Sequence, residues 1–235
     1  TFSLTFRASD GVNLATAVSS FTLQFSVENS RYTTALITSV GSTNNGTNSS
    51  FDDKSTSNHT ITANGAAHQT TFSPYRHGGY STYFDGTEYL KTNSSISLAN
   101  DFTMEFWIYR TGSGNDYMVC VGNTNSTAGM EVYIGSNGGQ FNFYHNGYWR
   151  ISSTSSIPAV NEWSHIAVVR NSGTVTMYLN GTSLGTYSMT DTISGEVDVN
   201  AELYNSSVAS GGDGYMRDVR IVDGTAIYTS NFTPP

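Results

Sequence analysis

The acidic side chains of the stretch GEVDVNAEL, residues 195–203, have the residue types that glycoside hydrolysis requires. Polar and apolar residues alternate here, so a β-strand would point Glu196, Asp198 and Glu202 to one side. Glycosidases need one carboxylic acid to protonate the leaving oxygen and a second carboxylate as nucleophile or base. A sugar-cleaving enzyme is therefore the first hypothesis to weigh.

The spacing of these acids argues against an enzyme. At about 3.3 Å per residue, Glu196 and Glu202 would lie ~20 Å apart on a straight strand, whereas working carboxylate pairs are about 5–9.5 Å apart. Glu196 and Asp198 are closer, but neighbouring acids on one face are common on solvated strands. We therefore predict no catalytic residues and a single amphipathic strand. Its predicted solvated face is Glu196, Asp198, Asn200 and Glu202, and its apolar face is Val197, Val199, Ala201 and Leu203.

The stretch YHNGYW, residues 144–149, combines residue types that bind carbohydrate. Aromatic rings at loops stack on sugar rings, and amides hydrogen-bond to sugar hydroxyls. The alternative is that Trp149 packs on a sheet or on a neighbouring subunit. The predicted carbohydrate-binding residues are Tyr144, His145, Asn146, Tyr148 and Trp149.

Other residues that could act as nucleophiles or zinc ligands are scattered. The 5 histidines lie in unrelated segments without metal-ligand spacing, which disfavours a zinc site and a Ser-His-Asp triad. Cys120 is the only cysteine and has apolar neighbours, so we predict a buried hydrophobic side chain and no intramolecular disulfide. No cofactor is predicted from these residues.

Composition excludes two classes of partner. Only 10 residues are basic against 18 acidic ones, and the net charge is −8, so no basic surface is available to neutralise phosphates. Nucleic acid is therefore not an expected partner. No apolar run is long enough to cross a bilayer, so membrane insertion is not expected either.

Strands must position these residues, because period-two alternation recurs along the chain between short turn signals. In DFTMEFWIYRT, residues 101–111, alternate residues from Phe102 to Ile108 would face a core. We predict that Trp107 and Trp163 are packing anchors and not ligand platforms, because large aromatics dominate sandwich cores. Hairpins are predicted with turns at Asn171-Ser172-Gly173, at Asn146-Gly147 and at Asp223-Gly224.

Many short strands with such turns predict an all-β fold, an antiparallel two-sheet sandwich. Residues 40–57 are polar and aperiodic, which predicts a loop. Residues 1–33 alternate on their own, but two strands alone are not stable in water. We therefore predict an N-terminal strand segment, residues 1–33, that pairs with another sheet or subunit, followed by a main domain, residues 34–235.

Five stretches of the chain follow the order and spacing of a known family. They are FDDKSTSNHTITANG (51–65), GGYSTYFDGTEYL (78–90), DFTMEFWIYRT (101–111), EWSHIAVVRNSGTVTMYLNGTSLGT (162–186) and GYMRDVRIVDGTAIYTSNFTPP (214–235). From about Phe51 onward, the chain resembles a laminin-G-like domain of the concanavalin A-like jelly-roll superfamily, in the form common in structural proteins of tailed bacteriophages. The resemblance implies a jelly-roll sandwich.

The resemblance also implies a function and a location. It predicts a non-enzymatic structural or adhesion module of a virion, such as a tail fibre, capsid fibre or decoration protein, at the virion surface or outside the cell. Residues 1–33 would join it to other virion proteins or sister subunits by strand addition, and host surface glycans are a further expected partner. The alternatives are a secreted carbohydrate-binding lectin module and, less favoured, a glycoside hydrolase of the same superfamily.

The resemblance leaves calcium binding open. Some laminin-G-like relatives bind calcium at the rim of the sandwich through carboxylate and carbonyl oxygens. No spaced acidic array singles out such a site here, so solvated turn acids are the simpler interpretation. The candidate ligands are Asp52, Asp53, Asp213, Asp218 and Asp223.

Overall fold

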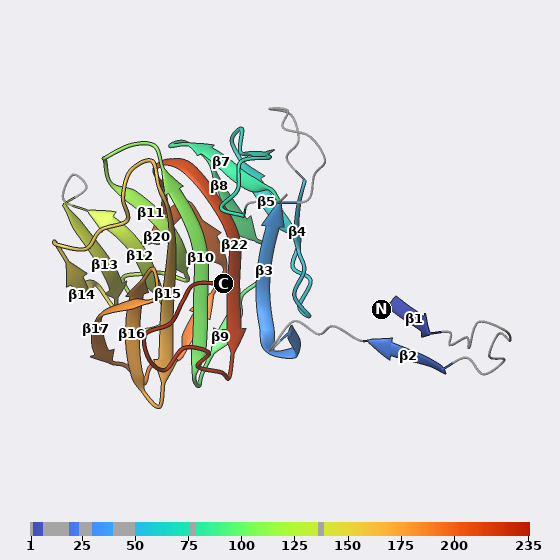
Figure 1. The fold of residues 1–235 in the computed structure, drawn as a ribbon. Coiled ribbons are helices and arrows are strands. Elements are labelled where there is room, and N and C mark those ends of the chain that lie inside the picture. The colour runs from blue at the N-terminus through green and yellow to red at the C-terminus, as the bar shows by residue number, and fades with distance from the viewer. Residues whose placement is uncertain (1, 7–18, 24–29, 40–49, 76–78, 136–138) are drawn as a thin grey trace, which may run out of the picture. The chain divides into compact units, whose positions relative to one another are not determined.

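The structure is a computed structural model that describes residues 2–6, 19–23, 30–39, 50–75, 79–135 and 139–235. The chain divides into two compact units, Thr1–Ser30 and Arg31–Pro235. The first unit contains an antiparallel hairpin of β1 (Phe2–Phe6) and β2 (Ser19–Leu23). The second unit begins within the short 3-10 helix η1 (Ser30–Tyr32) and is a β-sandwich (Figure 1).

The first sheet of the sandwich has nine strands in the described part of the chain. Its main path runs β17-β16-β15-β10-β22-β3-β4, and β7 joins β22 and β6 at one end. Every pairing in it is antiparallel. The strands are β3 (Thr33–Ser39), β4 (Phe51–Asp53), β6 (His68–Thr70), β7 (Ser81–Asp85), β10 (Phe102–Arg110), β15 (Trp163–Asn171), β16 (Thr174–Leu179), β17 (Thr182–Ser188) and β22 (Asp213–Asp223).

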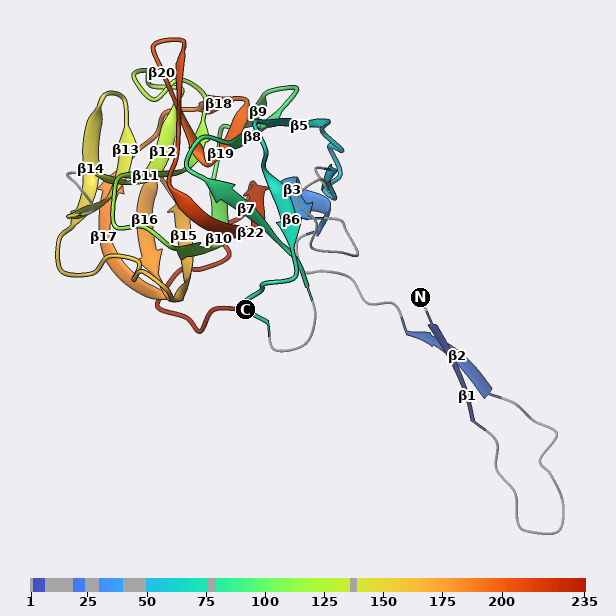
Figure 2. The ribbon, with the colours of Figure 1, turned by 90° about the horizontal axis from the view of Figure 1, so that it is seen from above.

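The second sheet has seven described strands in the order β14-β13-β12-β11-β19-β8-β5, again antiparallel throughout. They are β5 (Ile61–Asn64), β8 (Tyr89–Thr92), β11 (Asp116–Val121), β12 (Met130–Gly135), β13 (Gln140–His145), β14 (Tyr148–Ser153) and β19 (Val197–Val199). Two small ladders lie beside it, β9 (Ile96–Leu98) with β18 (Ile193–Gly195) and β20 (Ala201–Tyr204) with β21 (Ser207–Ser210). The hairpin of β20 and β21 is the orange hairpin labelled β20 in Figure 2 and contacts β11.

The core lies between the two sheets and confirms the predicted all-β antiparallel sandwich. Phe102, Met104 and Phe106 of β10 are fully buried on its inner face, as their alternation predicted. Val132 of β12 and Phe143 of β13 meet them from the other sheet in one hydrophobic cluster. Burying a side chain of this size contributes about 1.5–3 kcal/mol, so core burial is a large favourable term for a chain without a disulfide.

Two of the three predicted hairpins are confirmed. Ser172 and Gly173 join β15 to β16, and Asn146 and Gly147 join β13 to β14, all four with positive φ. The third prediction, at Asp223-Gly224, is wrong. β22 is an 11-residue strand that ends at Asp223, and residues 224–235 contain no strand.

The predicted loop over residues 40–57 is partly wrong, while residues 40–49 lie outside the described part of the chain. Phe51–Asp53 forms β4, which pairs with the end of β3. Phe51 is buried in the core, and Asp53 is only 3% exposed. The polar composition of this segment gives little sign of a strand, because Phe51 is the only apolar residue in this short edge strand.

Trp107 and Trp163 pack against aromatic neighbours, as predicted, but on the outer face of a sheet and not between the two sheets. Both are half-buried on the outer face of the nine-stranded sheet, because they alternate with the inward-facing residues of β10 and β15. Phe72 packs against Trp163, with ring centroids 5.3 Å apart, and against Tyr109, at 4.7 Å. The sheet therefore carries an aromatic layer on its outer side as well.

The chain after β22 returns across this outer face. Tyr228 and Phe232 stack with ring centroids 3.6 Å apart and pack against Tyr178 of β16. The Phe232 N–H donates to the Gly181 carbonyl at 3.0 Å, and a Cβ on Gly181 would overlap the Phe232 oxygen. The C-terminal residues are thus part of the fold. Among the described residues, no helix has the length and apolar character needed to cross a membrane.

Candidate functional site

A groove of about 660 Å³ lies on the outer face of the seven-stranded sheet. Glu131 and Tyr133 alternate along β12 with Val132 and Ile134, which belong to the core, so the first two point outward. The β20–β21 hairpin supplies further lining residues, including Tyr204. The side chains on which the site depends are Tyr117, Glu131, Tyr133, Tyr144, Trp149 and Glu202.

Aromatic rings form the walls of this groove. Tyr117 stacks on Tyr133, with ring centroids 6.0 Å apart and planes at 26°, and Tyr144 meets Tyr133 edge-on at 6.0 Å. Trp149 remains 53% exposed. Trp149 and Tyr144 also line an adjoining hollow of about 410 Å³, together with Tyr148. The two hollows therefore form one elongated surface with rings along it.

The β20–β21 hairpin brings a carboxylate to this surface. Its two-residue turn, Asn205-Ser206, has positive φ at both positions, which matches a type I′ hairpin turn. The backbone N–H of Thr124 donates to the Leu203 carbonyl at 3.0 Å, and the Thr124 hydroxyl donates to Oε1 of Glu202 at 3.1 Å. These bonds fix Glu202 against the groove.

Glu202 forms a carboxyl pair with Glu131, which is 1% exposed. Burial, and then the neighbouring charge of Glu202, raises the pKa of Glu131 well above its ordinary value. Burial also raises the pKa of Glu202, although hydrogen bonds with Thr124, Glu131 and Tyr117 oppose the rise. Both shifts favour the protonated form of these carboxyls, because burial and a second negative charge each oppose ionisation.

The pair is linked by a side-chain hydrogen bond. Glycosidases hold their two catalytic carboxyls about 5–9.5 Å apart, with the scissile bond between them. A hydrogen-bonded carboxyl pair can donate and accept hydrogen bonds at the floor of an aromatic groove.

The predicted solvated acidic strand, residues 196–202, is wrong. β19 ends at Val199, and Asn200 has φ +63, which turns the chain into the β20–β21 hairpin. Asp198 is fully buried and Asn200 is 4% exposed, with its amide donating to the Glu88 carbonyl at 2.9 Å. The chain changes direction at Asn200, and neighbouring segments bury Asp198 and Asn200. The single solvated face that the alternation predicted is therefore not formed.

Asp198 and Glu196 both lie near the Lys91 ammonium, but Asp198 is buried and Glu196 is partly exposed. Glu196 is partly exposed and lies 2.6 Å from the Lys91 ammonium, whereas Asp198 lies 3.9 Å from it. Neither carboxyl oxygen of Asp198 has a hydrogen-bond partner among the described residues. Burial raises the pKa of Asp198 to about 6, with the charge of Lys91 limiting the rise.

The predicted carbohydrate-binding residues separate into two groups. Tyr144 and Trp149 line the groove, Tyr148 is 66% exposed beside it, and Asn146 forms the turn between β13 and β14. His145 is fully buried, so the prediction that it contacts a ligand is wrong. Alternation places it on the opposite side of β13 from Tyr144.

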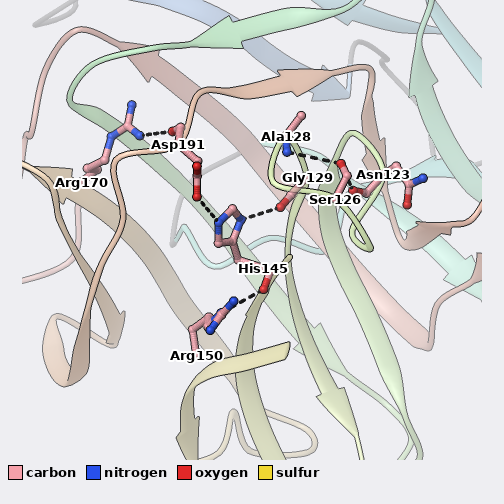
Figure 3. A network of polar contacts seen from close by, with 8 residues as sticks. All are labelled: Asn123, Ser126, Ala128, Gly129, His145, Arg150, Arg170 and Asp191. Carbon is pink, nitrogen blue, oxygen red and sulfur yellow. Dashed lines mark hydrogen bonds and ion pairs between the residues drawn. The ribbon is translucent and has the colours of Figure 1, made fainter. Parts of the chain in front are cut away.

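His145 instead anchors the turn that carries Trp149. Its Nδ1 lies 2.8 Å from the Gly129 carbonyl and its Nε2 3.1 Å from a carboxylate oxygen of Asp191, as Figure 3 shows. Arg150 donates to the His145 carbonyl at 3.0 Å, and Arg170 donates to the Asp191 carbonyl at 2.6 Å. This network ties the end of β13 to segments of both sheets.

The side chains that complete the groove were not among the residues predicted from the sequence. Glu131 and Tyr133 could have been found from the alternation in MEVYIG, which places them on one face of a strand. Tyr117 lies beside a register shift in β11, which disturbs the local alternation. Tyr204 reaches the groove only through the hairpin, which no local pattern indicates.

The candidate calcium ligands are dispersed. Asp53 accepts backbone N–H groups of Leu36, Ser55 and His59 at 2.8–2.9 Å, so it organises the chain around β4 and is not a solvated turn acid. Asp218 accepts from Arg217 and Tyr75. In the described part of the chain, no group of three or more His, Cys, Asp or Glu side chains is placed to hold a metal ion.

Comparison with known families places the fold. A model of the concanavalin A-like lectin/glucanases superfamily matches residues 84–226, more than half of the chain. This chain belongs to that superfamily. The matched region contains every groove strand together with the β20–β21 hairpin. No curated protein matches the sequence.

Solved structures of similar fold include two domains in complex with small ligands. Domain 4 of AbnA, a GH43 extracellular arabinanase from Geobacillus stearothermophilus, in complex with arabinotriose, has a TM-score of 0.56 at 14% identity, over 74% of this chain and 87% of that one. The botulinum neurotoxin DC binding domain in complex with SialylT has a TM-score of 0.56 at 15% identity, over 83% of this chain and 48% of that one.

A third similar structure is the neurotoxin DC binding domain in complex with rat synaptotagmin II, with a TM-score of 0.57 at 14% identity, over 82% and 48% of the two chains. This chain of the concanavalin A-like superfamily thus spans about half the length of the neurotoxin chains. At these identities the likeness shows the shared fold alone.

Proposed function

We propose that this chain is a non-enzymatic carbohydrate-binding module whose ligand lies in the groove between β11–β14 and the β20–β21 hairpin. The observation that carries the proposal is the row of rings from Tyr117 to Trp149 above a hydrogen-bonding floor. Saccharides present apolar C–H faces and hydroxyl edges, so rings and carboxyls together suit them. The arabinotriose and SialylT complexes of similar folds support this assignment.

The carboxyl pair favours binding over hydrolysis. Glu131 and Glu202 are linked by a side-chain hydrogen bond, and the buried Asp198 lies outside the residues that line the groove. A water molecule or a glycosidic oxygen needs a gap between an acid and a second carboxylate. The glycoside hydrolase alternative would require these groups to separate when substrate binds.

Replacing Trp149 by Ala is expected to weaken saccharide binding about 10- to 100-fold, because stacked rings contribute roughly 1.5–3 kcal/mol at such sites. The measurement is isothermal titration calorimetry against neutral hexasaccharides, including arabinohexaose, after a glycan array has ranked them. Tyr32→Ala is the matched control, because Tyr32 is also an exposed aromatic, at 42%, but does not line the groove.

Equal loss in both variants would contradict a role for the groove, and so would unchanged affinity in Trp149→Ala. Hydrolysis of any of these saccharides by the wild-type protein, abolished by Glu202→Gln, would overturn the non-enzymatic assignment in favour of a glycoside hydrolase.

We further propose that the module acts on a virion surface, as part of a tail fibre, capsid fibre or decoration protein. The support is the order of the five sequence stretches, which resembles tailed-phage structural proteins. The N-terminal hairpin β1–β2 forms a unit apart from the sandwich and is the proposed link to other virion proteins or sister subunits. A secreted lectin module is the alternative.

A chain that lacks residues 1–30 is expected to fold, because Arg31–Pro235 has its own core, and to fail to join assembled particles. Purified particles from cells that express either form would be compared by mass spectrometry for copy number. Circular dichroism and saccharide binding of the free truncated chain confirm its fold. Equal incorporation of both forms would overturn the proposed role of the N-terminal unit.

A further inference from the structure

The floor of the groove has an unusual chemical character for a surface hollow. Glu131 is 99% removed from solvent, and its Oε1 has no hydrogen-bond partner among the described residues. A buried carboxyl oxygen without a hydrogen-bond partner destabilises the fold, so a group that supplies a hydrogen bond there is favoured. Glu131 lines the groove, which makes a ligand placed there the available partner.

We infer that the Glu131–Glu202 pair selects neutral, hydroxyl-rich saccharides and rejects acidic ones. This inference rests on the proposed function and names the ligand class of the same groove. The pair offers one shared proton and one unshared negative charge, which together can donate to and accept from sugar hydroxyls. An acidic sugar would place a second negative charge beside it.

The described side chains that face the pair are aromatic, acidic or a thiol. Facing Glu131 are Cys120 and Tyr117 from β11 and Tyr144 from β13, with Tyr133 adjacent on β12. Glu202 faces it from β20, and Asp198 lies beyond Cys120 on β19. No Lys or Arg is among the described residues that line the groove.

The charge balance also distinguishes a neutral ligand from a cationic one. An ammonium group would displace the shared proton, so its binding would strengthen as pH rises. A neutral hydroxyl ligand uses the proton, so its binding would weaken when the pair ionises fully at alkaline pH. Burial raises the pKa values of Tyr117, Tyr133 and Tyr144, so these rings do not ionise first.

The first experiment needs no ligand. Difference infrared spectroscopy at neutral pH is expected to show a protonated carboxylic acid band in the wild-type protein that disappears in Glu131→Gln. Absence of a band that depends on Glu131 would overturn the shared proton and with it the inference, while leaving the proposed groove untouched.

The second experiment compares three probes of equal length by calorimetry between pH 6 and pH 10, namely arabinohexaose, hexagalacturonic acid and an N,N,N-trimethylated glucosamine hexamer, whose positive charges do not titrate. The neutral probe is expected to bind at pH 7 and to lose about tenfold in affinity by pH 10, which corresponds to about 1.4 kcal/mol. Glu131→Gln cannot ionise, so its affinity for the neutral probe, whatever its value at pH 7, should show no alkaline loss.

The outcomes separate this inference from the proposed function. If the acidic hexamer binds as tightly as the neutral one, or the glucosamine hexamer binds more tightly as pH rises, the selection of neutral ligands is wrong while the groove remains a saccharide site. If none of the three probes and no glycan on the array is bound, the proposed function fails and the inference fails with it.

Discussion

Replacing Glu105 by Ala is expected to lower the free energy of unfolding by about 3–5 kcal/mol, because removing one member of a buried charged network leaves its partners uncompensated. Glu105 is 4% exposed on the outer face of β10. Its carboxylate lies 3.2 Å from His165 Nε2 and 3.1 Å from Arg220, and it accepts from the Tyr228 hydroxyl at 2.7 Å. It joins three strands to the C-terminal segment.

The pH dependence of this contribution follows from the direction of the shift. Burial alone would raise the pKa of Glu105, but hydrogen bonds from His165 and Tyr228 and the charge of Arg220 hold it below its ordinary value. A carboxyl whose pKa is lowered by folding stabilises the fold at pH values above its ordinary pKa. This stability is lost as the pH falls through the pKa of the folded state. Wild type should therefore lose more stability than Glu105→Ala below about pH 4.

Urea unfolding followed by tryptophan fluorescence measures both effects. Glu162→Ala is the control, because Glu162 is exposed and its removal should change the free energy by less than about 0.5 kcal/mol. A loss below about 1 kcal/mol in Glu105→Ala would show that solvent or rearranged side chains replace the network.

Replacing Asp198 by Asn is expected to raise the free energy of unfolding at pH 8 by about 1–3 kcal/mol. Burial raises the pKa of Asp198 to about 6, so at pH 8 the folded protein holds an ionised carboxylate away from solvent. Between the ordinary pKa near 4 and about 6, the folded state binds more protons than the unfolded state. Wild-type stability should therefore fall as pH rises through this window. Asn cannot ionise, so the variant lacks this component.

The quantity to measure is the difference in unfolding free energy between wild type and Asp198→Asn from pH 4 to pH 8. Subtracting the two curves isolates Asp198 from Glu131 and Glu202, whose pKa values are also raised. Asp52→Asn serves as the matched exposed control. A difference that stays constant with pH would show that Lys91 compensates the buried charge fully.

The strands of the sandwich could be predicted because alternation is a local property. In β10, every second residue from Phe102 to Ile108 is buried, as the sequence predicted, since successive side chains point to opposite faces. Turn residues such as Asn146-Gly147 likewise act through their own backbone conformation. The same local rule puts Trp107 on the face opposite to the buried residues of β10, which is where the structure has it. The general preference of large aromatics for cores pointed the other way, because it takes no account of the strand face.

The groove needed contacts that are not local. Tyr144 and Trp149 could be chosen from one stretch, whereas Glu131, Tyr117 and Glu202 join them only through strand pairing and the β20–β21 hairpin. His145 was predicted as a ligand contact because it lies next to these residues in the sequence. In the structure it is buried and hydrogen-bonds with Gly129 and Asp191, so it anchors the turn.

The sequence by itself determined the strand pattern, the apolar interior and the superfamily, because these depend on residue alternation and on motif order along the chain. Only the tertiary structure decided which polar side chains remain exposed to solvent. Asp198 and Glu131 sit on outward faces that neighbouring segments cover, and burial, not residue type, sets their protonation. The free energy of a carboxyl depends on the solvent and charges around it, and these arrive from segments distant in the sequence.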